Sequence, residues 1–250
     1  MNSILELKKI YKNFLSTNNI LEEISYKFLQ TNSYAITGIS GVGKSTLMQI
    51  LAGIDTPTHG NVYFNDLDIN KLSISKKDIF LNESVGIVFQ SPHLIKEFSV
   101  IENVMIKKLI KNNNFSLYKD DALDLLSLAN LAEKAFEYPS ALSGGQQQRV
   151  AICRAIFNKP KFLLADEPTA NLDEATSSTI INLLFKYKKE CSLGLVLVSH
   201  DKNVINKVDE VLQIKDGKLI KISSNQEHEL KINAIKAIVP ATNQNVFTNV

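Results

Sequence analysis

The sequence has little net charge, few cysteines and no long apolar run. Its 28 lysines and arginines are nearly balanced by 26 aspartates and glutamates, which leaves a net charge of +2. A broad basic face for nucleic acid is therefore not expected. No apolar stretch approaches the ~18 residues that a transmembrane helix needs, and the start, MNSILELKKI, lacks the basic-then-apolar order of a signal peptide. We expect a chain that neither spans nor crosses a membrane by itself.

Cysteine is scarce enough to bear on the cellular compartment. Cys153 and Cys191 are the two cysteines, and they lie far apart in apolar stretches of the sequence. We interpret both as reduced core residues of a cytosolic protein rather than as partners in a disulfide.

The length of 250 residues suits one large α/β domain, or one domain with an inserted subdomain. Residues 4–30 alternate loosely between apolar and polar, which predicts short strands of a mixed or antiparallel sheet. The stretches KFLLADE (161–167) and LGLVLVSH (193–200) are apolar on both faces, as strands inside a parallel sheet must be.

The pattern turns helical between the expected strands. Ser99 and Glu102 form an S-x-x-E capping box before one apolar stripe, and a second stripe lies around residues 122–129. We therefore expect a helical subdomain at about residues 91–159 within a domain of residues 1–221. The polar segment 222–250 is expected to be a peripheral helix or a disordered end.

The segment GISGVGKST matches the phosphate-binding pattern G-x-x-x-x-G-K-[S/T]. It follows an apolar strand and opens a helix, so backbone N–H groups and the helix dipole would face phosphate oxygens. Lys44 would bridge the β- and γ-phosphates, and the Ser45 hydroxyl would ligate Mg²⁺. The residues expected at the phosphates are Gly38, Ser40, Gly41, Val42, Gly43, Lys44, Ser45 and Thr46.

Polar residues follow three further apolar strands: Gln90, the pair Asp166-Glu167, and His200. Because ligands of open parallel sheets bind beyond the carboxyl ends of the strands, these side chains should converge on the phosphate loop. Asp166 would complete the Mg²⁺ site opposite Ser45, and Gln90 could touch the metal or the attacking water. Glu167 would polarise that water, and His200 could donate to the γ-phosphate.

The stretch LSGGQQQRVAICRA resembles the signature motif of ABC-type ATPases. Gln90 then matches the Q-loop, FLLADEPT the Walker B motif, ANLD the D-loop and His200 the H-loop, in the family's order over about residues 4–221. The resemblance implies an α/β fold: a P-loop NTPase core with a mainly parallel sheet, an N-terminal antiparallel β subdomain and an inserted α-helical subdomain. It also implies ATP hydrolysis that depends on Mg²⁺.

A second consequence of the resemblance concerns assembly. Ser143 would cap a helix whose glycines, Gly144 and Gly145, let its N–H groups approach an anion. In the family this helix covers the γ-phosphate bound by a second subunit, so two chains placed head to tail would enclose two ATP molecules. The resemblance assigns Gln146 and Asp173 to the seam of this homodimer, and Phe14, or alternatively Tyr11, to stacking on adenine.

Within the family, LAGIDTPTHGNVYFND and GIVFQSPHLIKEFSVIENV are similar to lipoprotein-releasing ATP-binding subunits, and also to the macrolide-export and cell-division groups. This implies integral membrane partners, no nucleic acid partner, and a peripheral place at the cytoplasmic face of the bacterial inner membrane. Pro92, His93, Leu94 and Phe98 are candidate contacts for these partners, and a core role for Leu94 and Phe98 remains an equal alternative.

Two other classes of protein fit less well. Soluble ABC ATPases of translation or DNA repair carry two fused cassettes or a long coiled-coil insertion, and a chain of 250 residues has room for neither. A regulatory nucleotide-binding module without turnover would be expected to lack Glu167 or His200, and both are present.

Overall fold

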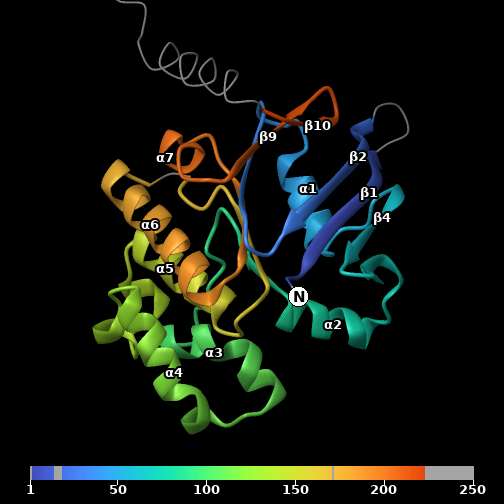
Figure 1. Cartoon of the computed structure of the whole chain (residues 1–250). Coiled ribbons are helices and arrows are strands. Elements are labelled where there is room, and N and C mark those ends of the chain that lie inside the picture. Colours follow the sequence, from blue (N-terminus) through green and yellow to red (C-terminus); the bar gives the residue numbers. More distant parts are fainter. Residues whose placement is uncertain (1, 14–18, 171, 223–250) are drawn as a thin grey trace, which may run out of the picture.

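The computed structural model describes residues 2–13, 19–170 and 172–222. Within these ranges, two β-sheets form the frame of the molecule (Figure 1). The N-terminal sheet is antiparallel, in the order β2-β1-β4-β5, and it consists of β1 (Ile4–Asn13), β2 (Asn19–Leu29), β4 (His59–Phe64) and β5 (Leu67–Asp68). The expected strands at residues 4–30 are thus confirmed as an antiparallel pair.

The second sheet has the order β10-β9-β3-β8-β7-β6, and all of its pairs are parallel except β9 with β10. Its strands are β3 (Ser33–Thr37), β6 (Val85–Val88), β7 (Phe162–Asp166), β8 (Gly194–Val198), β9 (Glu210–Lys215) and β10 (Lys218–Lys221). Strands β3, β8, β7 and β6 are consecutive neighbours, so the four strand ends that the sequence singled out lie along one edge of this sheet.

Helices cover both faces of the parallel sheet. They are α1 (Lys44–Leu51), α2 (Ile74–Glu83), α3 (Val100–Lys111), α4 (Phe115–Leu128), α5 (Gly144–Ile156), α6 (Glu174–Cys191) and α7 (Lys202–Ile205), with 3₁₀ turns η1 (Ile69–Lys71), η2 (Ala132–Lys134) and η3 (Pro139–Ala141). In the part of the chain that the structure describes, no helix combines the length and apolar character needed to span a bilayer.

The alternation of side chains along the buried strands divides the core into two clusters. One face of the sheet packs against α3, α4, α5 and α6 and includes Ala35, Leu163, Ala165, Leu195 and Leu197. The other packs against α1 and the N-terminal sheet and includes Tyr34, Ile36, Leu164, Val196 and Val198. Helices α1 and α5 therefore lie on opposite faces of the sheet (Figure 1).

Three helices are absent from the sequence-based expectations, namely α2, α6 and the short α7. Helix α2 buries one of its residues, Phe80, so its sequence carries almost no apolar period. Helix α6 is 18 residues long, and its start is marked by Asp173, whose carboxylate accepts a hydrogen bond from the Thr176 N–H at 2.9 Å. Aspartate is a common helix N-cap, so the sequence carries a signal for the start of α6.

The cysteines are both free, as expected, but only one is a core residue. Cys153 is fully buried on α5, where burial raises the pKa of its thiol to about 12. The expectation for Cys191 was wrong: it is the last residue of α6, at the end of the helix rather than inside it, and it is only partly buried. Phe14 and the segment 223–250 lie outside the described residues.

The capping box predicted at the start of α3 is confirmed. The same helix also carries Lys107, a lysine with a lowered pKa. The Ser99 N–H donates to the Glu102 carboxylate at 2.8 Å, and the Glu102 N–H donates to Ser99 Oγ at 3.4 Å. Lys107 is largely buried and donates to the Leu81 carbonyl at 3.1 Å. Burial, together with the nearby charge of Arg154, lowers the pKa of Lys107 to about 8.

This lysine predicts a pH dependence of folding. Because its pKa is lower in the folded chain, the unfolded chain binds more protons between pH 8 and the unfolded pKa of 10.5. The contribution of Lys107 to stability must therefore rise with pH across this window. Lys107→Met lacks this group, so the free energy of unfolding of the parent should rise by up to about 3 kcal/mol relative to that of the variant between pH 7 and pH 10. Urea unfolding at both pH values measures this difference, and an equal difference at both would contradict it.

Candidate active site

The loop from Gly38 to Gly43 connects β3 to α1, and its backbone requires glycine. Gly43 precedes the helix at a φ of 102°, and Gly41 has a φ of 78°. A Cβ on Gly43 would also stand 2.6 Å from Ile20 Cγ2. No side chain caps α1, so the first backbone N–H groups of the helix are left for an anion. Ser45 and Thr46 lie in this first turn.

Lys44 is folded over the loop. Its Nζ donates to the carbonyls of Gly38 at 2.7 Å and Ile39 at 3.0 Å, and the residue is 6% exposed. The ammonium group is thereby held at the centre of the loop, where it would meet phosphate oxygens.

Ser45 and Asp166 face one another across the base of the loop. Burial raises the pKa of Asp166, a hydrogen bond with the Ser45 side chain lowers it, and the charge of neighbouring Glu167 raises it. Asp166 Oδ1 is buried and has no hydrogen-bond partner among the described residues. A hard divalent cation would supply the missing partner, so this pair of oxygen ligands fits Mg²⁺.

Glu167 stands in a strained conformation directly after β7. Its φ is 45°, in the left-handed region that non-glycine residues rarely adopt. The Glu167 N–H donates to the Val198 carbonyl at 3.0 Å, which fixes the residue against β8. With His200 and Thr169 it lines a pocket of about 270 Å³.

His200 lies at the end of β8, close to the same groups. Burial lowers its pKa, the charge of Lys44 lowers it further, and Glu167 opposes the shift. The imidazole is therefore neutral near pH 7, so it can donate one hydrogen bond to an anion. The structure thus brings Lys44, Asp166, Glu167 and His200 together at one edge of the sheet.

Gln90 follows β6 at the same edge. Strands β6 and β7 pair with Val88 opposite Ala165, so Gln90 and Glu167 both lie two residues beyond this pair. The Gln90 side chain is exposed, which leaves its amide available to a ligand.

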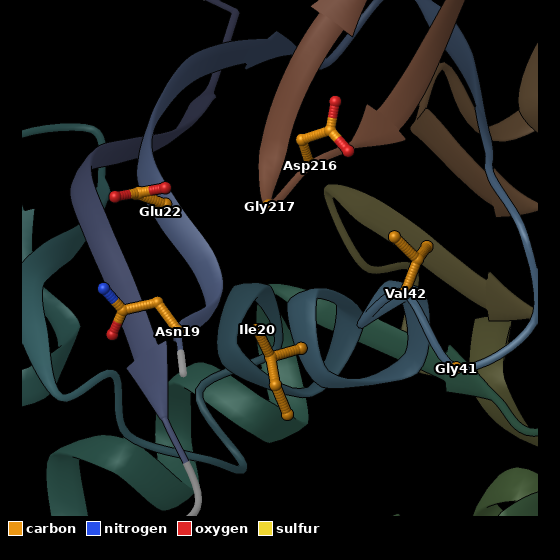
Figure 2. A pocket seen from close by; sticks show the side chains of 7 residues that line it. All are labelled: Asn19, Ile20, Glu22, Gly41, Val42, Asp216 and Gly217. Atoms are coloured by element: carbon orange, nitrogen blue, oxygen red, sulfur yellow. The ribbon is translucent and has the colours of Figure 1, made fainter. Parts of the chain in front are cut away.

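A hollow of about 550 Å³ lies beside the phosphate loop (Figure 2). Gly41 and Val42 of the loop border one side, Asn19, Ile20 and Glu22 of β2 border the other, and Asp216 and Gly217 come from the β9–β10 turn. This size suits a small ligand. The residues from β2 and from the β9–β10 turn are far apart in the sequence, and the fold brings them beside the loop. No local sequence motif therefore marks them.

Of the two aromatic residues considered for adenine stacking, only Tyr11 lies within the described residues. It lies on β1, its ring packs edge-on to His59 at 6.3 Å, and it does not line the hollow beside the loop. Phe14, the first choice, falls in the segment that the structure leaves undescribed.

The second glycine motif forms the start of α5. Ser143 and Gln146 make a reciprocal capping box: the Ser143 N–H donates to Gln146 Oε1 at 2.8 Å, and the Gln146 N–H donates to Ser143 Oγ at 3.3 Å. A Cβ on Gly145 would stand 2.2 Å from Thr176 Cγ2, whereas a Cβ on Gly144 would stand 3.7 Å from Leu172 Cδ2. Gly145 is thus required by packing against α6, whereas Gly144 is exposed and a Cβ there would make only an ordinary contact.

The two glycine-rich helix starts belong to different halves of the molecule. Leu47 and Ile50 of α1 pack in one core cluster, and Val150 and Ile152 of α5 pack in the other, across the parallel sheet. A Cβ on Gly144 would meet Leu172 and one on Gly145 would meet Thr176, and neither of these neighbours belongs to the phosphate loop. Asp173, the other residue expected at the seam, lies nearby as the cap of α6.

Comparison with known proteins identifies relatives over most of the chain. The sequence pattern of the ABC transporter family matches residues 21–170. The lipoprotein-releasing system ATP-binding protein LolD of Bdellovibrio bacteriovorus is 40% identical over 213 residues, which cover 85% of this chain and 97% of that protein. LolD of Buchnera aphidicola is 36% identical over 228 residues, covering 90% of this chain and all of that protein.

Solved structures agree with this assignment. The chain is similar to the ATP-binding cassette MJ0796 in a dimeric post-hydrolysis state bound to ADP and Pi, with 33% identity and a TM-score of 0.79 over 88% of this chain and 99% of that one. It is also similar to cbiO1 of Clostridium perfringens, part of the ABC transporter complex cbiONQ, with 29% identity, a TM-score of 0.81 and 95% coverage of both chains.

Proposed function

The chain belongs to the ABC transporter family, and we propose that it is the ATP-hydrolysing subunit that drives release of lipoproteins from a bacterial inner membrane. One observation supports the choice of the lipoprotein-releasing group within this family. The LolD proteins of Bdellovibrio, Xanthomonas and Buchnera are 36–40% identical to this chain over nearly their full lengths. The ATPase function itself is supported by the convergence of charged and polar groups on the phosphate loop.

The phosphoryl-transfer machinery follows from the positions of the side chains. The loop N–H groups and Lys44 hold the β- and γ-phosphates, and the hollow in Figure 2 receives the nucleoside. Ser45 and Asp166 would hold Mg²⁺, aided by Gln90, and the ion would neutralise charge on the phosphate oxygens. Glu167 orients and deprotonates the attacking water, and neutral His200 donates to the γ-phosphate.

Homodimer formation is supported by the placement of the two helix starts. Helices α1 and α5 pack on opposite faces of the same sheet, and Gly145 at the start of α5 packs against Thr176 of α6, so we infer that the second helix start does not complete the site of its own chain. A second copy in head-to-tail orientation brings Ser143, Gly144, Gly145 and Gln146 to the γ-phosphate, with Asp173 at the seam. The dimeric state of the similar cassette MJ0796 agrees with this arrangement.

The membrane partner would bind a groove beside the segment that follows Gln90. This groove measures about 550 Å³ and is lined by His93, Leu94, Lys96 and residues of the turn before α5. Leu94 also packs against the core, so its core role and its exposure in the groove coexist. The subunit would then lie peripherally at the cytoplasmic face of the inner membrane.

Reconstitution tests the choice of branch. The chain is co-purified with its integral membrane partners, placed in proteoliposomes with an acylated lipoprotein, and supplied with Mg-ATP. We expect ATP-dependent release of the lipoprotein to a soluble acceptor and faster ATP turnover when lipoprotein is present. Stimulation by a macrolide or a peptide instead, without lipoprotein release, would assign the chain to a related exporter.

Lys44→Ala tests the phosphate loop. The substitution removes a charge-assisted hydrogen bond to phosphate of about 1.5–3 kcal/mol, so the Kd for ATP should rise about 10- to 150-fold. Equilibrium dialysis with labelled ATP measures this. Lys76→Ala, at an exposed position on α2, serves as a matched control in which affinity should not change. An unchanged Kd for Lys44→Ala would show that the loop does not bind the phosphates.

A further inference from the structure

The segment that carries Gln90 is held in place by side chains of α5. Gln148 is 2% exposed, and its Nε2 donates to the Phe89 carbonyl at 3.0 Å, one residue before Gln90. Arg154 donates to the carbonyls of Pro92 at 2.6 Å and His93 at 2.7 Å, just after Gln90. Two side chains from one helix thus bracket Gln90 on both sides.

The backbone of this segment has few partners of its own. Among the described residues, no backbone–backbone hydrogen bond involves residues 90–94. The next residues are held by Asn103 of α3, which is fully buried, accepts from the Ile95 N–H at 2.8 Å and donates to the Ile95 carbonyl at 2.9 Å. The position of Gln90 therefore depends on the side chains that hold the segment rather than on a strand ladder.

Arg154 holds the strained part of the segment. His93 has a φ of 46°, and its ring packs edge-on to Phe89 at 5.7 Å. No carboxylate within the described ranges forms an ion pair with Arg154, so its charge is directed at the two backbone carbonyls. A planar guanidinium can serve two carbonyls at once, which an ammonium group does less well.

The same helix begins at the second glycine motif. Helix α5 runs without interruption from its cap at Ser143, through Gln148, to Arg154 near its last turn. We propose that Arg154, assisted by Gln148, is a positioning residue that ties the placement of Gln90 to the signature helix α5. This inference rests on the proposed function, because it takes Gln90 as a group that touches the metal or the attacking water.

The chain supplies a matched control. Its two arginines, Arg149 and Arg154, both lie on α5. Arg149 also donates to a backbone carbonyl, that of Ala129 at 2.7 Å, but this carbonyl is remote from the Gln90 segment. Arg154→Met and Arg149→Met each remove an arginine that donates to backbone carbonyls from the same helix. Arg154→Lys retains the positive charge but lacks the planar guanidinium that can serve two carbonyls.

Steady-state kinetics on the full chain separate positioning from general support of the fold. Arg154→Met should lower kcat about 10- to 100-fold, because a small displacement of a reacting group is enough for such a loss. The KM for ATP should stay close to that of the parent, and Arg154→Lys should recover part of the loss. In a Gln90→Ala background, Arg154→Met should change kcat by less than about two-fold, whereas any effect of Arg149→Met should be the same in both backgrounds.

Hydrogen–deuterium exchange on the nucleotide-free chain gives a second readout that does not need ATP turnover. Arg154→Met should raise exchange of the Ile95 and Phe98 amides, which are hydrogen-bonded to Asn103 and to the Ile95 carbonyl, about ten-fold, and Arg149→Met should not. Equal losses of kcat with and without Gln90, or unchanged exchange in Arg154→Met, would overturn the positioning role. If the parent fails to hydrolyse ATP, the proposed function fails, and the exchange measurement still decides whether Arg154 holds the segment.

Discussion

Glu167→Gln should leave ATP binding intact and lower the rate of hydrolysis by about 10²- to 10⁴-fold, the usual contribution of a general base. Glutamine keeps the size and hydrogen-bonding shape of the side chain but cannot take a proton from water. The neighbouring acid, Asp166, lies beside Ser45 and has one buried oxygen without a hydrogen-bond partner, so it is occupied by the metal in our account.

Phosphate release and equilibrium binding of labelled ATP measure the two halves of this prediction. Glu190→Gln, the same exchange at an exposed position near the end of α6, is the matched control and should hydrolyse ATP at the parental rate. Near-normal turnover in Glu167→Gln would assign the base to another group, and loss of ATP binding would give Glu167 a structural role instead.

Gly144→Asp should abolish ATP-driven dimerisation and lower turnover about 100-fold or more, while the ATP affinity of the monomer changes by no more than about two-fold. In the dimer, the new carboxylate would face the γ-phosphate of the partner chain. In the monomer this position is exposed and tolerates a Cβ, and an acidic residue in the first turn of α5 agrees with the helix dipole.

The structure decides which glycine to replace. A side chain at Gly145 would collide with Thr176 of α6, so a Gly145 variant would confound dimerisation with folding. Gly144→Ala is the matched control, because its Cβ would make an ordinary contact of 3.7 Å with Leu172 Cδ2 and adds no charge. A Gly144→Asp chain that loses ATP affinity as a monomer would show that the motif serves its own nucleotide.

The sequence was sufficient for the parts of the site whose chemistry is local. The phosphate loop is a contiguous motif, and the strands that end at Gln90, Asp166 and His200 were recognisable because they are apolar on both faces. Parallel pairing then requires their ends to meet. The carboxyl ends of parallel strands share one edge whatever the strand order, and ligands of such sheets bind at that edge.

Features that depend on contacts between distant segments could not be predicted. The hollow beside the loop joins Glu22 to Asp216, and Arg154 reaches the Pro92 carbonyl 62 residues away. Nothing near Arg154 in the sequence distinguishes it from Arg149. The place of Cys191 was also misjudged, because an apolar neighbourhood in sequence does not reveal that a residue stands at the end of a helix.

Sedimentation equilibrium of Glu167→Gln, with and without Mg-ATP, tests the head-to-tail site most directly. Because this variant should bind ATP without hydrolysing it, we expect a monomer of 27.9 kDa without nucleotide and a dimer of twice that mass with it. Dialysis should find two ATP molecules per dimer, and adding Gly144→Asp should return the mass to that of a monomer that still binds ATP. A Glu167→Gln chain that binds ATP fully and remains a monomer at every concentration would contradict the shared site.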